Sequence, residues 1–312
     1  MSYKKRIMVD SLASQEKNNF DQFYTNHLTA KKIISIFTEK LKELNYQKIN
    51  FLEPSAGTGN FLEAIREISK NNSFISKKTL AFDIEPKSDK ESIITANFLK
   101  VPLTKYLKKE KRDSYVIIGN PPFGKKGKLA LNFVNKSAEV IDTIGFILPL
   151  TFRRWSIQSK LNKDLQLIYD INLEPNSFLA NDKIYSLNSC FQIWTKRKTE
   201  QKDLRIKEKP ITKHSDFEMF LHNNTRPTLK FFQKNKYNWD FAVVRQGFYD
   251  YTQKIVRKKD LFKNRQYIFF KSKDEAVQQK LLQLNFAKLA QKNTVIPGFG
   301  KHDVIMAYND LC

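Results

Sequence analysis

Hydrophobic positions in the first two thirds of the chain follow two alternating spacings. Between about residues 48 and 195, short apolar and β-branched runs alternate with segments in which apolar residues recur every three or four positions. The first spacing is typical of buried strands and the second of helices. The alternation predicts an α/β fold built on a doubly wound parallel sheet. The predicted strands cover residues 49–53, 79–85, 92–98, 115–119, 143–150, 165–173 and 190–196, and the predicted helices cover residues 60–69 and 128–141.

The pattern changes after residue 195. Residues 195–210 are rich in lysine and have the composition of a solvated linker. Beyond them, residues 239–253 and 265–272 are strand-like, and residues 274–292 have the spacing of an amphipathic helix. We therefore predict two parts, an α/β domain over residues 1–200 and a smaller α+β region over residues 201–312.

Composition adds a strong positive charge. The formal net charge is +23 over 312 residues, and both predicted parts share in it. Such a charge favours a polyanionic partner such as nucleic acid, although AT-rich coding alone can also enrich a chain in lysine. Two cysteines and four histidines show no metal-ligand spacing, and no apolar run is long enough to cross a bilayer. The start of the chain lacks the apolar region of a secretory signal, so we expect a cytoplasmic protein with no metal and no membrane partner.

The sequence YVIIGNPPFGKK, residues 115–126, ends a predicted strand abruptly. Pro121 and Pro122 cannot donate to a strand ladder, and a proline pushes the preceding Asn120 into an extended conformation. The segment is either an ordinary exit from a strand or a rigid loop at the carboxyl end of the sheet. The second location is where open α/β sheets bind ligands.

The sequence FLEPSAGTGNF, residues 51–61, has a small-residue turn between a predicted strand and a predicted helix. Glycines let the backbone approach a ligand closely at such a turn. A dinucleotide-binding loop needs a further glycine where this chain has Leu62, which argues against NAD. Asp83 closes the next strand and is placed to accept ribose hydroxyls, with a turn or helix cap as the alternative.

Taken in this order, the motifs resemble those of a known enzyme family. FLEPSAGTGNF resembles the S-adenosylmethionine loop of class I methyltransferases, and NPPF resembles the motif of enzymes that methylate amino groups. The segment DQFYTNHLTAKKI, residues 21–33, resembles the one that precedes this loop in gamma-class N6-adenine DNA methyltransferases. The resemblance covers residues 20–196 and implies a Rossmann-like sheet.

The resemblance also implies a set of site residues. Asp83 would hold the cofactor ribose and Ile84 would pack on its adenine. Asn97 stands where the family commonly has aspartate, although an amide oxygen can still accept the same hydrogen bond. The residues implied to bind S-adenosyl-L-methionine are Thr25, Glu53, Pro54, Ser55, Ala56, Gly57, Gly59, Asp83, Ile84, Asn97 and Phe98. The implied catalytic residues are Asn120, Pro121, Pro122 and Phe123, with Phe178 as a second aromatic wall around the target base.

These residue types suit the methylation of an exocyclic amine. The lone pair of the adenine amine is delocalised into the ring, which makes the amine a poor nucleophile. Two fixed oxygens that accept hydrogen bonds from its two N–H groups would raise its nucleophilicity. The Asn120 side chain and the Pro121 carbonyl can supply them, held in place beforehand by the two prolines. Phe123 offers a flat face for stacking. A base in a duplex must be flipped out to reach such a pocket.

Three other functions share parts of this pattern. Ribosomal RNA amino-methyltransferases, acting on guanine N2 or adenine N6, carry the same tetrapeptide and suit the same charge. Enzymes that methylate glutamine in release factors also carry it but need no such charge. A non-catalytic nucleic-acid-binding module that keeps the fold is the third alternative.

Residues 201–312 carry no catalytic motif, and we expect them to form the DNA target-recognition region. Arg245 and Lys254 flank an aromatic segment and are expected to face double-stranded DNA. Arg226, Arg257 and Arg265 are further candidates for base contacts. The sequence leaves open the recognition site, the oligomeric state and the existence of a cognate restriction endonuclease.

Overall fold

A computed structural model describes residues 23–87, 92–107, 114–180, 183–291 and 296–311 of the chain. The start of the chain, the first two residues of the 21–33 segment and Cys312 lie outside these ranges. The chain forms two compact units. The first comprises Met1–Ile147, Asn176–Ser186 and Gln192–Glu200, and the second comprises Leu148–Pro175, Leu187–Phe191 and Gln201–Cys312.

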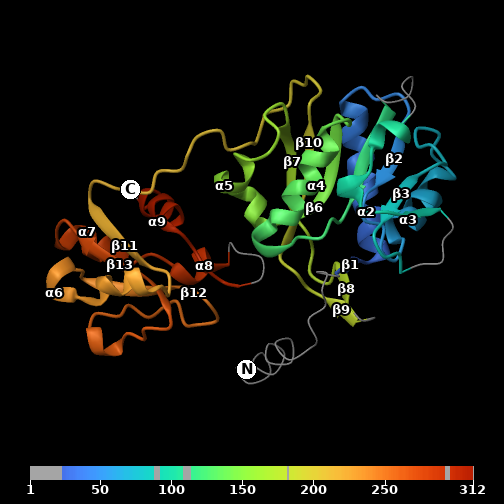
Figure 1. The fold of residues 1–312 in the computed structure, drawn as a ribbon. Coiled ribbons are helices and arrows are strands. Elements are labelled where there is room, and N and C mark those ends of the chain that lie inside the picture. The colour runs from blue at the N-terminus through green and yellow to red at the C-terminus, as the bar shows by residue number, and fades with distance from the viewer. Residues whose placement is uncertain (1–22, 88–91, 108–113, 181–182, 292–295, 312) are drawn as a thin grey trace. The chain divides into compact units, whose positions relative to one another are not determined.

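A seven-stranded sheet dominates the α/β part of the chain (Figure 1). Its strands from β4 to β6 pair in parallel, in the order 3-2-1-4-5 that is typical of doubly wound folds. The predicted α/β class is therefore confirmed. The order across the sheet is β4 (Ile93–Thr95), β3 (Leu80–Asp83), β2 (Asn50–Glu53), β5 (Tyr115–Gly119), β6 (Thr143–Pro149), β10 (Ser189–Thr195) and β7 (Gln166–Asn172).

The last strand in the chain order, β10, runs against its neighbour β6. Thr143 at the start of β6 lies 2.8 Å, oxygen to oxygen, from Thr195 at the end of β10. Near the other ends, the Cys190 thiol donates to the Leu148 carbonyl at 3.4 Å. These two contacts join the start of one strand to the end of the other, so β10 is antiparallel to β6.

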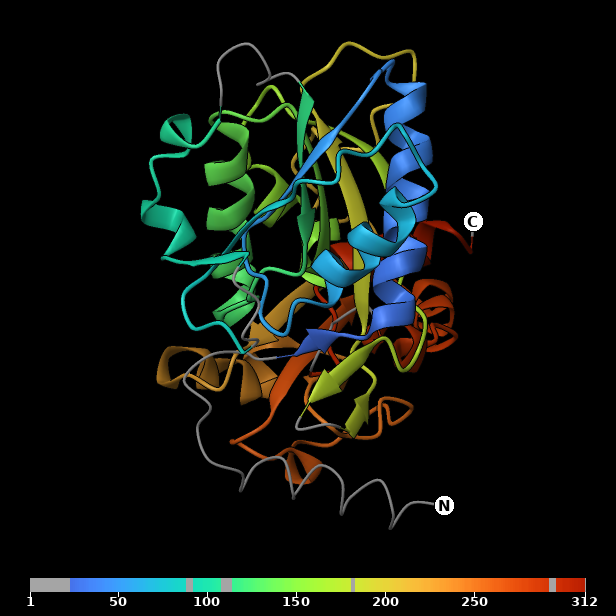
Figure 2. The ribbon, with the colours of Figure 1, turned by 90° about the vertical axis from the view of Figure 1, so that its right-hand side faces the viewer.

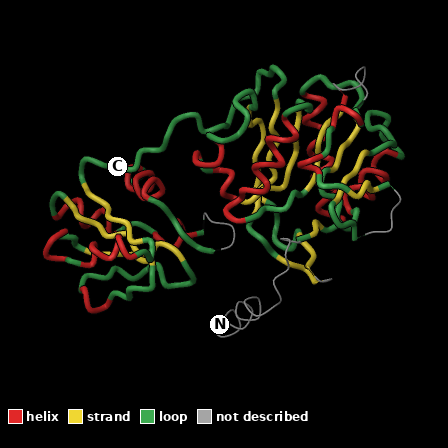
Figure 3. The backbone as a smooth tube through the Cα atoms, in the orientation of Figure 1, coloured by secondary structure: helices red, strands yellow, loops and turns green. Residues whose placement is uncertain are grey.

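Helices cover both faces of the sheet (Figures 2 and 3). α2 (His27–Glu43) and α3 (Asn60–Ser69) lie on one face, and α4 (Lys128–Ala138) lies on the other. α2 was not among the predicted elements. It begins at Asn26, whose side-chain oxygen accepts from the Thr29 amide at 2.7 Å, and it buries one apolar face. That face comprises Ala30, Ile33, Ile34, Phe37 and Leu41.

A small three-stranded sheet takes two of its strands from the stretch between β7 and β10. It consists of β1 (Tyr24–Thr25), β8 (Phe178–Ala180) and β9 (Lys183–Tyr185), all antiparallel (Figure 1). In it Thr25 pairs with Phe178. The sheet therefore joins the start of the described chain to a segment about 150 residues later.

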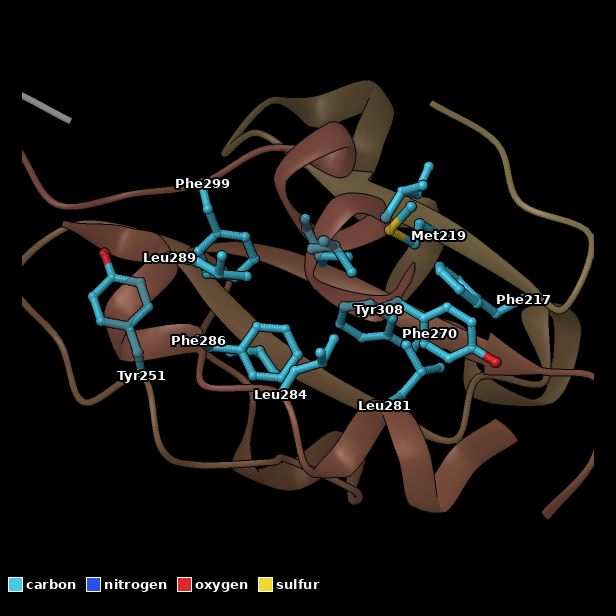
Figure 4. Packing of buried hydrophobic residues seen from close by; sticks show 14 of the residues in the cluster. Phe217, Met219, Tyr251, Phe270, Leu281, Leu284, Phe286, Leu289, Phe299 and Tyr308 are labelled. Carbon is cyan, nitrogen blue, oxygen red and sulfur yellow. The ribbon is translucent and has the colours of Figure 1, made fainter. Parts of the chain in front are cut away.

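The part of the chain after residue 210 is α+β, as predicted. Its sheet has the order β11 (Phe217–His222), β13 (Gln266–Ser272) and β12 (Phe241–Gln246), and all pairs are antiparallel. Figure 4 shows the aromatic core on one face of this sheet. The second unit also contains α5 (Trp155–Gln158), α6 (Lys234–Tyr237), α7 (Glu275–Leu282), α8 (Phe286–Ala290) and α9 (Lys301–Asn309). Short 3-10 helices cover Phe98–Lys100, Leu103–Lys105, Lys125–Gly127, Leu150–Arg153, Arg226–Phe232 and Lys258–Asp260.

Two local predictions for this region were wrong. The strand predicted over residues 239–253 ends at Gln246, because Gly247 has φ +118 and turns the chain away. The helix predicted over residues 274–292 is two helices, since Asn285 caps a new start by accepting from the Lys288 amide at 2.9 Å. Residues 196–210, predicted as a solvated linker, form no helix or strand and are exposed or half-buried. Arg205 anchors this segment, because its guanidinium donates to the carbonyls of residues 158, 161, 162 and 165.

Candidate active site

A pocket of about 300 Å³ lies where β2, β3 and β5 end, at the carboxyl edge of the sheet. An adjoining cavity of about 30 Å³ shares its Phe23, Tyr24, Ser55 and Asn120 lining. The structure thus brings most of the predicted site residues together. Those lining the larger pocket are Pro54, Ser55, Gly57, Asp83, Ile84, Asn97, Phe98, Asn120, Pro121, Pro122 and Phe123, and those lining the smaller include Thr25, Glu53 and Ala56.

The glycine turn after β2 requires both of its glycines. Gly57 has φ +51, and a Cβ there would lie 2.7 Å from the ring of Tyr24. Gly59 has φ +78 and precedes the first residue of α3. Gly59 lines neither cavity, so its role is to end the turn and start the helix.

Asp83 ties the end of β3 to this turn. One of its carboxylate oxygens accepts from the Gly57 amide at 2.7 Å, and the other accepts from the Glu85 amide at 2.8 Å. The capping role considered from the sequence is therefore present. A carboxylate oxygen can accept more than one hydrogen bond, so both oxygens can still receive a hydroxyl from the pocket.

The wall beyond β4 is mostly apolar. Asn97 caps the short helix after β4, where its side-chain oxygen accepts from the Leu99 amide at 3.1 Å. Phe98 is buried and stacks on Phe133, with ring centroids 5.4 Å apart. Ile84 is 54% exposed at the pocket lining. This wall therefore offers flat and branched apolar surface beside the Asn97 amide.

Asn120 has its amide fixed from one side. Its Nδ2 donates to the Phe23 carbonyl at 2.8 Å, and its own backbone carbonyl accepts from the Ser55 hydroxyl at 3.2 Å. With the Nδ2 end held by Phe23, the side-chain oxygen is the end left to accept a hydrogen bond from a bound group. The loop is thus arranged in advance, as electrostatic catalysis requires.

The rest of the NPPF loop is anchored on α4. The Phe123 carbonyl accepts from the Leu129 amide at 3.2 Å and from the Ala130 amide at 3.3 Å. Gly124 has φ +66, and a Cβ there would lie 2.6 Å from Cβ of Leu129. The close approach fixes the position of Phe123 at the pocket.

Phe178 does not line either cavity. It is fully buried in β8, opposite Thr25. Its role as an aromatic wall around the target base stays a prediction, because the side chain lies outside both cavities. Phe23 lines both cavities instead and stacks on Tyr185, with ring centroids 5.1 Å apart. Sequence reasoning missed Phe23 and Tyr24, although both belong to the FYT run that contains Thr25.

Burial shapes the electrostatics of this edge. The Tyr24 pKa is raised from its ordinary value of 10.0, mainly because burial disfavours the phenolate. Among the described residues, no group of three or more histidine, cysteine, aspartate or glutamate side chains is arranged to hold a metal ion.

The two predicted DNA contacts of the second unit pack against their own unit. Arg245 is half-buried and donates to the Asn223 side chain, and burial lowers its pKa. The Lys254 ammonium lies 5.7 Å from the centroid of the Phe286 ring. Both stay predictions as contacts of a duplex.

Neither protein-family models nor curated proteins gave a match to this chain. Solved structures with a similar fold include a Listeria monocytogenes protein provisionally assigned as a class I S-adenosylmethionine-dependent methyltransferase, at 13% identity over 65% of this chain and 69% of that one, TM-score 0.42. A second is the type I restriction-modification system methyltransferase subunit of Streptococcus thermophilus, at 16% identity over 57% of this chain and 45% of that one, TM-score 0.39. A third is the 23S rRNA methyltransferase ErmE, at 15% identity over 58% of this chain and 71% of that one, TM-score 0.36. At this level of identity the likeness is one of fold alone.

In the described part of the chain, no helix is long and apolar enough to span a membrane.

Proposed function

We propose that this protein transfers the methyl group of S-adenosyl-L-methionine to the N6 amine of adenine in DNA. The observation that carries the proposal is the Asn120 amide, held by the Phe23 carbonyl at a pocket that also contains the glycine turn and Asp83. Together these residues supply a hydrogen-bond acceptor for a target amine next to a binding site for a nucleoside cofactor. We further propose residues 1–200 as the catalytic domain and residues 201–312 as the target-recognition region.

The residues present fit the cofactor. Gly57 lines the pocket with bare backbone beside the Tyr24 ring, where a Cβ would collide with that ring. The Thr25 hydroxyl oxygen is buried and has no hydrogen-bond partner in the described part of the chain, so a polar group in the smaller cavity would satisfy it. Thr25 and the turn after Glu53 would hold the methionine end, Asp83 the ribose, and Asn97 the adenine amine.

The cofactor, when bound, supplies an electrophilic methyl group. The Asn120 side-chain oxygen and the Pro121 carbonyl would each accept a hydrogen bond from one N–H group of the target amine. These bonds favour a tetrahedral nitrogen with a localised lone pair and stabilise the positive charge that forms as nitrogen bonds to carbon. Transfer would break the sulfonium C–S bond and leave a neutral thioether, and the methylated amine would then give one proton to water. Phe123 would stack on the base and hold the amine at the acceptors.

A ribosomal RNA amino-methyltransferase is the second candidate. The same motif serves enzymes acting on guanine N2 or adenine N6 of RNA, and the net charge of +23 suits either nucleic acid. We favour DNA because the segment before the glycine turn resembles that of the DNA enzymes. In the structure this segment provides β1, Asn26 as a helix cap and the carbonyl that holds Asn120.

The proposal is tested by supplying methyl-labelled cofactor with duplex DNA, ribosomal RNA or a release-factor protein in separate reactions. We expect label in DNA and none in protein. Label in ribosomal RNA alone would support the second candidate. Cofactor binding without transfer to any of the three would support a non-catalytic binding module.

A further inference from the structure

Three aromatic side chains of the second unit are exposed close to one another in sequence. Phe248 is 60% exposed, Tyr249 is 40% exposed and Phe262 is 53% exposed. Exposed apolar side chains that gather in one patch often mark an interaction site, whereas single ones are common on soluble proteins. None of these side chains belongs to the pocket described above.

Arg265 joins two of these rings into one cluster. Its guanidinium carbon lies 4.6 Å from the centroid of the Tyr249 ring and 4.2 Å from that of the Phe262 ring. Cation–π attraction of this kind holds the rings and the cation in a fixed arrangement. We call Phe248, Tyr249, Phe262 and Arg265 the aromatic–arginine cluster.

The loop that carries Phe248 and Tyr249 has a rigid base. The Gly247 amide donates to the Pro297 carbonyl at 3.0 Å. The Tyr251 hydroxyl lies 2.6 Å from the Gly247 carbonyl oxygen and 2.8 Å from that of Pro297. Gly247 also has φ +118, and any side chain there would collide with the Tyr249 ring. The exposed rings are therefore presented by an ordered turn.

The surroundings of the cluster are strongly basic. Residues 248–265 contain six basic and two acidic side chains. Asp260 is paired with Arg257 at 2.8 Å, and Asp250 accepts from the amide and hydroxyl of Thr252. Lys258, Lys259 and Lys263 are exposed, and no ion pair of theirs is found among the described residues. Exposed aromatic rings can stack on nucleic-acid bases, and the surrounding lysines can contact the phosphates.

We infer that the aromatic–arginine cluster binds double-stranded DNA, with its rings against the bases of an opened step and the neighbouring lysines at the phosphates. The inference rests on the proposed function and locates the DNA contact within residues 201–312. Apolar side chains inserted at a base step unstack and bend a duplex, while lysine contacts to phosphate supply salt-dependent affinity. Phe248, exposed beside the rigid Gly247 turn, is the side chain placed to act as the wedge.

The two kinds of contact are separated by titrating full-length protein against a fluorescein-labelled duplex at several salt concentrations. One double variant is Tyr249→Ala with Phe262→Ala, and the other is Lys258→Ala with Lys259→Ala. The ring variant should bind the duplex about tenfold or more weakly with an unchanged salt slope. The lysine variant should lower the slope of log affinity against log salt by about 1.8, because each lysine at a phosphate adds about 0.9 to that slope.

Ile211→Ala is the matched control, because Ile211 is 67% exposed in the same unit and lies outside the cluster. Phe248→Ala alone, a change at a 60% exposed side chain, is a second ring variant that leaves the Arg265 contacts in place. Thermal melting and cofactor titration should be unchanged in every variant.

If the wild-type protein methylates DNA and all variants bind the duplex as the control does, the inference is overturned and the proposed function stands. Stronger cluster-dependent binding to a matched RNA duplex or to anionic lipid vesicles would overturn the assignment to DNA. An absence of methyl transfer to DNA by the wild type would instead remove the proposed function.

Discussion

The Asn120 side chain has two different ends, and the structure fixes one of them. Its nitrogen donates to the Phe23 carbonyl, which directs the oxygen to whatever binds in the pocket. Asn120→Ala should lower turnover about a hundredfold or more, because it removes one preorganised polar group. Calorimetric affinity for the cofactor should change little, since the substitution removes no predicted cofactor contact.

Asn120→Asp is the informative companion. It keeps an acceptor at the same place but has no donor for the Phe23 carbonyl, so its turnover should fall between those of wild type and Asn120→Ala. Near wild-type turnover in Asn120→Ala would rule out activation of the amine by this side chain.

Asp83 makes two backbone hydrogen bonds and is also the predicted ribose partner. Asp83→Ala should weaken cofactor binding by about 1–3 kcal/mol, the cost of leaving polar partners unmet. Asp83→Asn keeps one acceptor oxygen and should weaken binding less. Isothermal titration calorimetry measures both, and an unchanged affinity in Asp83→Ala would remove this carboxylate from the cofactor site.

Residues at the ends of predicted strands could be predicted, and residues placed by pairing with a distant segment could not. Gly57, Asp83 and Asn120 each lie at or just after the end of a strand, and parallel strands place such ends at one edge. Phe23 reaches the same pocket because β1 pairs with β8. That pairing spans about 150 residues and has no local signal. The burial of Phe178 follows from the same pairing.

At the scale of elements, Arg205 makes the largest set of side-chain hydrogen bonds that anchor the segment after β10. Arg205 donates from Nη1 to the Asn162 and Leu165 carbonyls at 2.8 and 2.9 Å, and from Nη2 to the Gln158 and Leu161 carbonyls at 2.7 and 3.1 Å. Arg205→Ala should lower the free energy of unfolding by about 2 kcal/mol, as expected for charge-assisted hydrogen bonds. Urea denaturation measures this change.

Arg205→Lys tests whether the planar fork matters. A lysine ammonium is a point charge without the planar guanidinium's fork of donors, so it should recover little of the stability. Lys209→Ala is the control, because the Lys209 side chain is exposed in the same segment and its removal should change stability by less than about 0.5 kcal/mol. Equal stability of Arg205→Ala and the control would show that this anchoring is unimportant.

Elements with a strong local apolar pattern could be predicted from the sequence. Elements that depend on pairing with a distant strand or on a helix cap could not. The inner strands are continuous apolar runs, which the sequence shows directly. β11 has apolar side chains on both faces and is formed by pairing with β13 some fifty residues later. The break between α7 and α8 depends on a cap at Asn285, a feature that apolar spacing does not reveal.

At the scale of the whole molecule, several buried tyrosines link stability to alkaline pH. Burial raises the pKa of each, and that of Tyr251 reaches about 12. An unfolded tyrosine ionises near its ordinary value of about 10, so the unfolded chain loses protons that the folded chain keeps. Stability is therefore complete below about pH 10 and falls as pH rises above it. The tyrosines with raised pKa are Tyr24, Tyr46, Tyr251 and Tyr267.

Thermal melting at stepped alkaline pH measures this decline. Tyr251→Phe should be less stable at neutral pH, because its hydroxyl contacts two carbonyls, and should show a shallower alkaline decline. An alkaline decline as steep as that of the wild type would show that Tyr251 does not contribute to it.

The central claim is that the fixed Asn120 amide activates an adenine amine in DNA. The most direct measurement is mass spectrometry of nucleosides from duplex DNA incubated with the protein and S-adenosyl-L-methionine, with Asn120→Ala as the paired sample. We predict N6-methyladenine with the wild type and a rate of its formation about a hundredfold or more lower with the variant. Methylation confined to ribosomal RNA, a methylated base other than N6-methyladenine, or equal rates of product formation from the two proteins would contradict the claim.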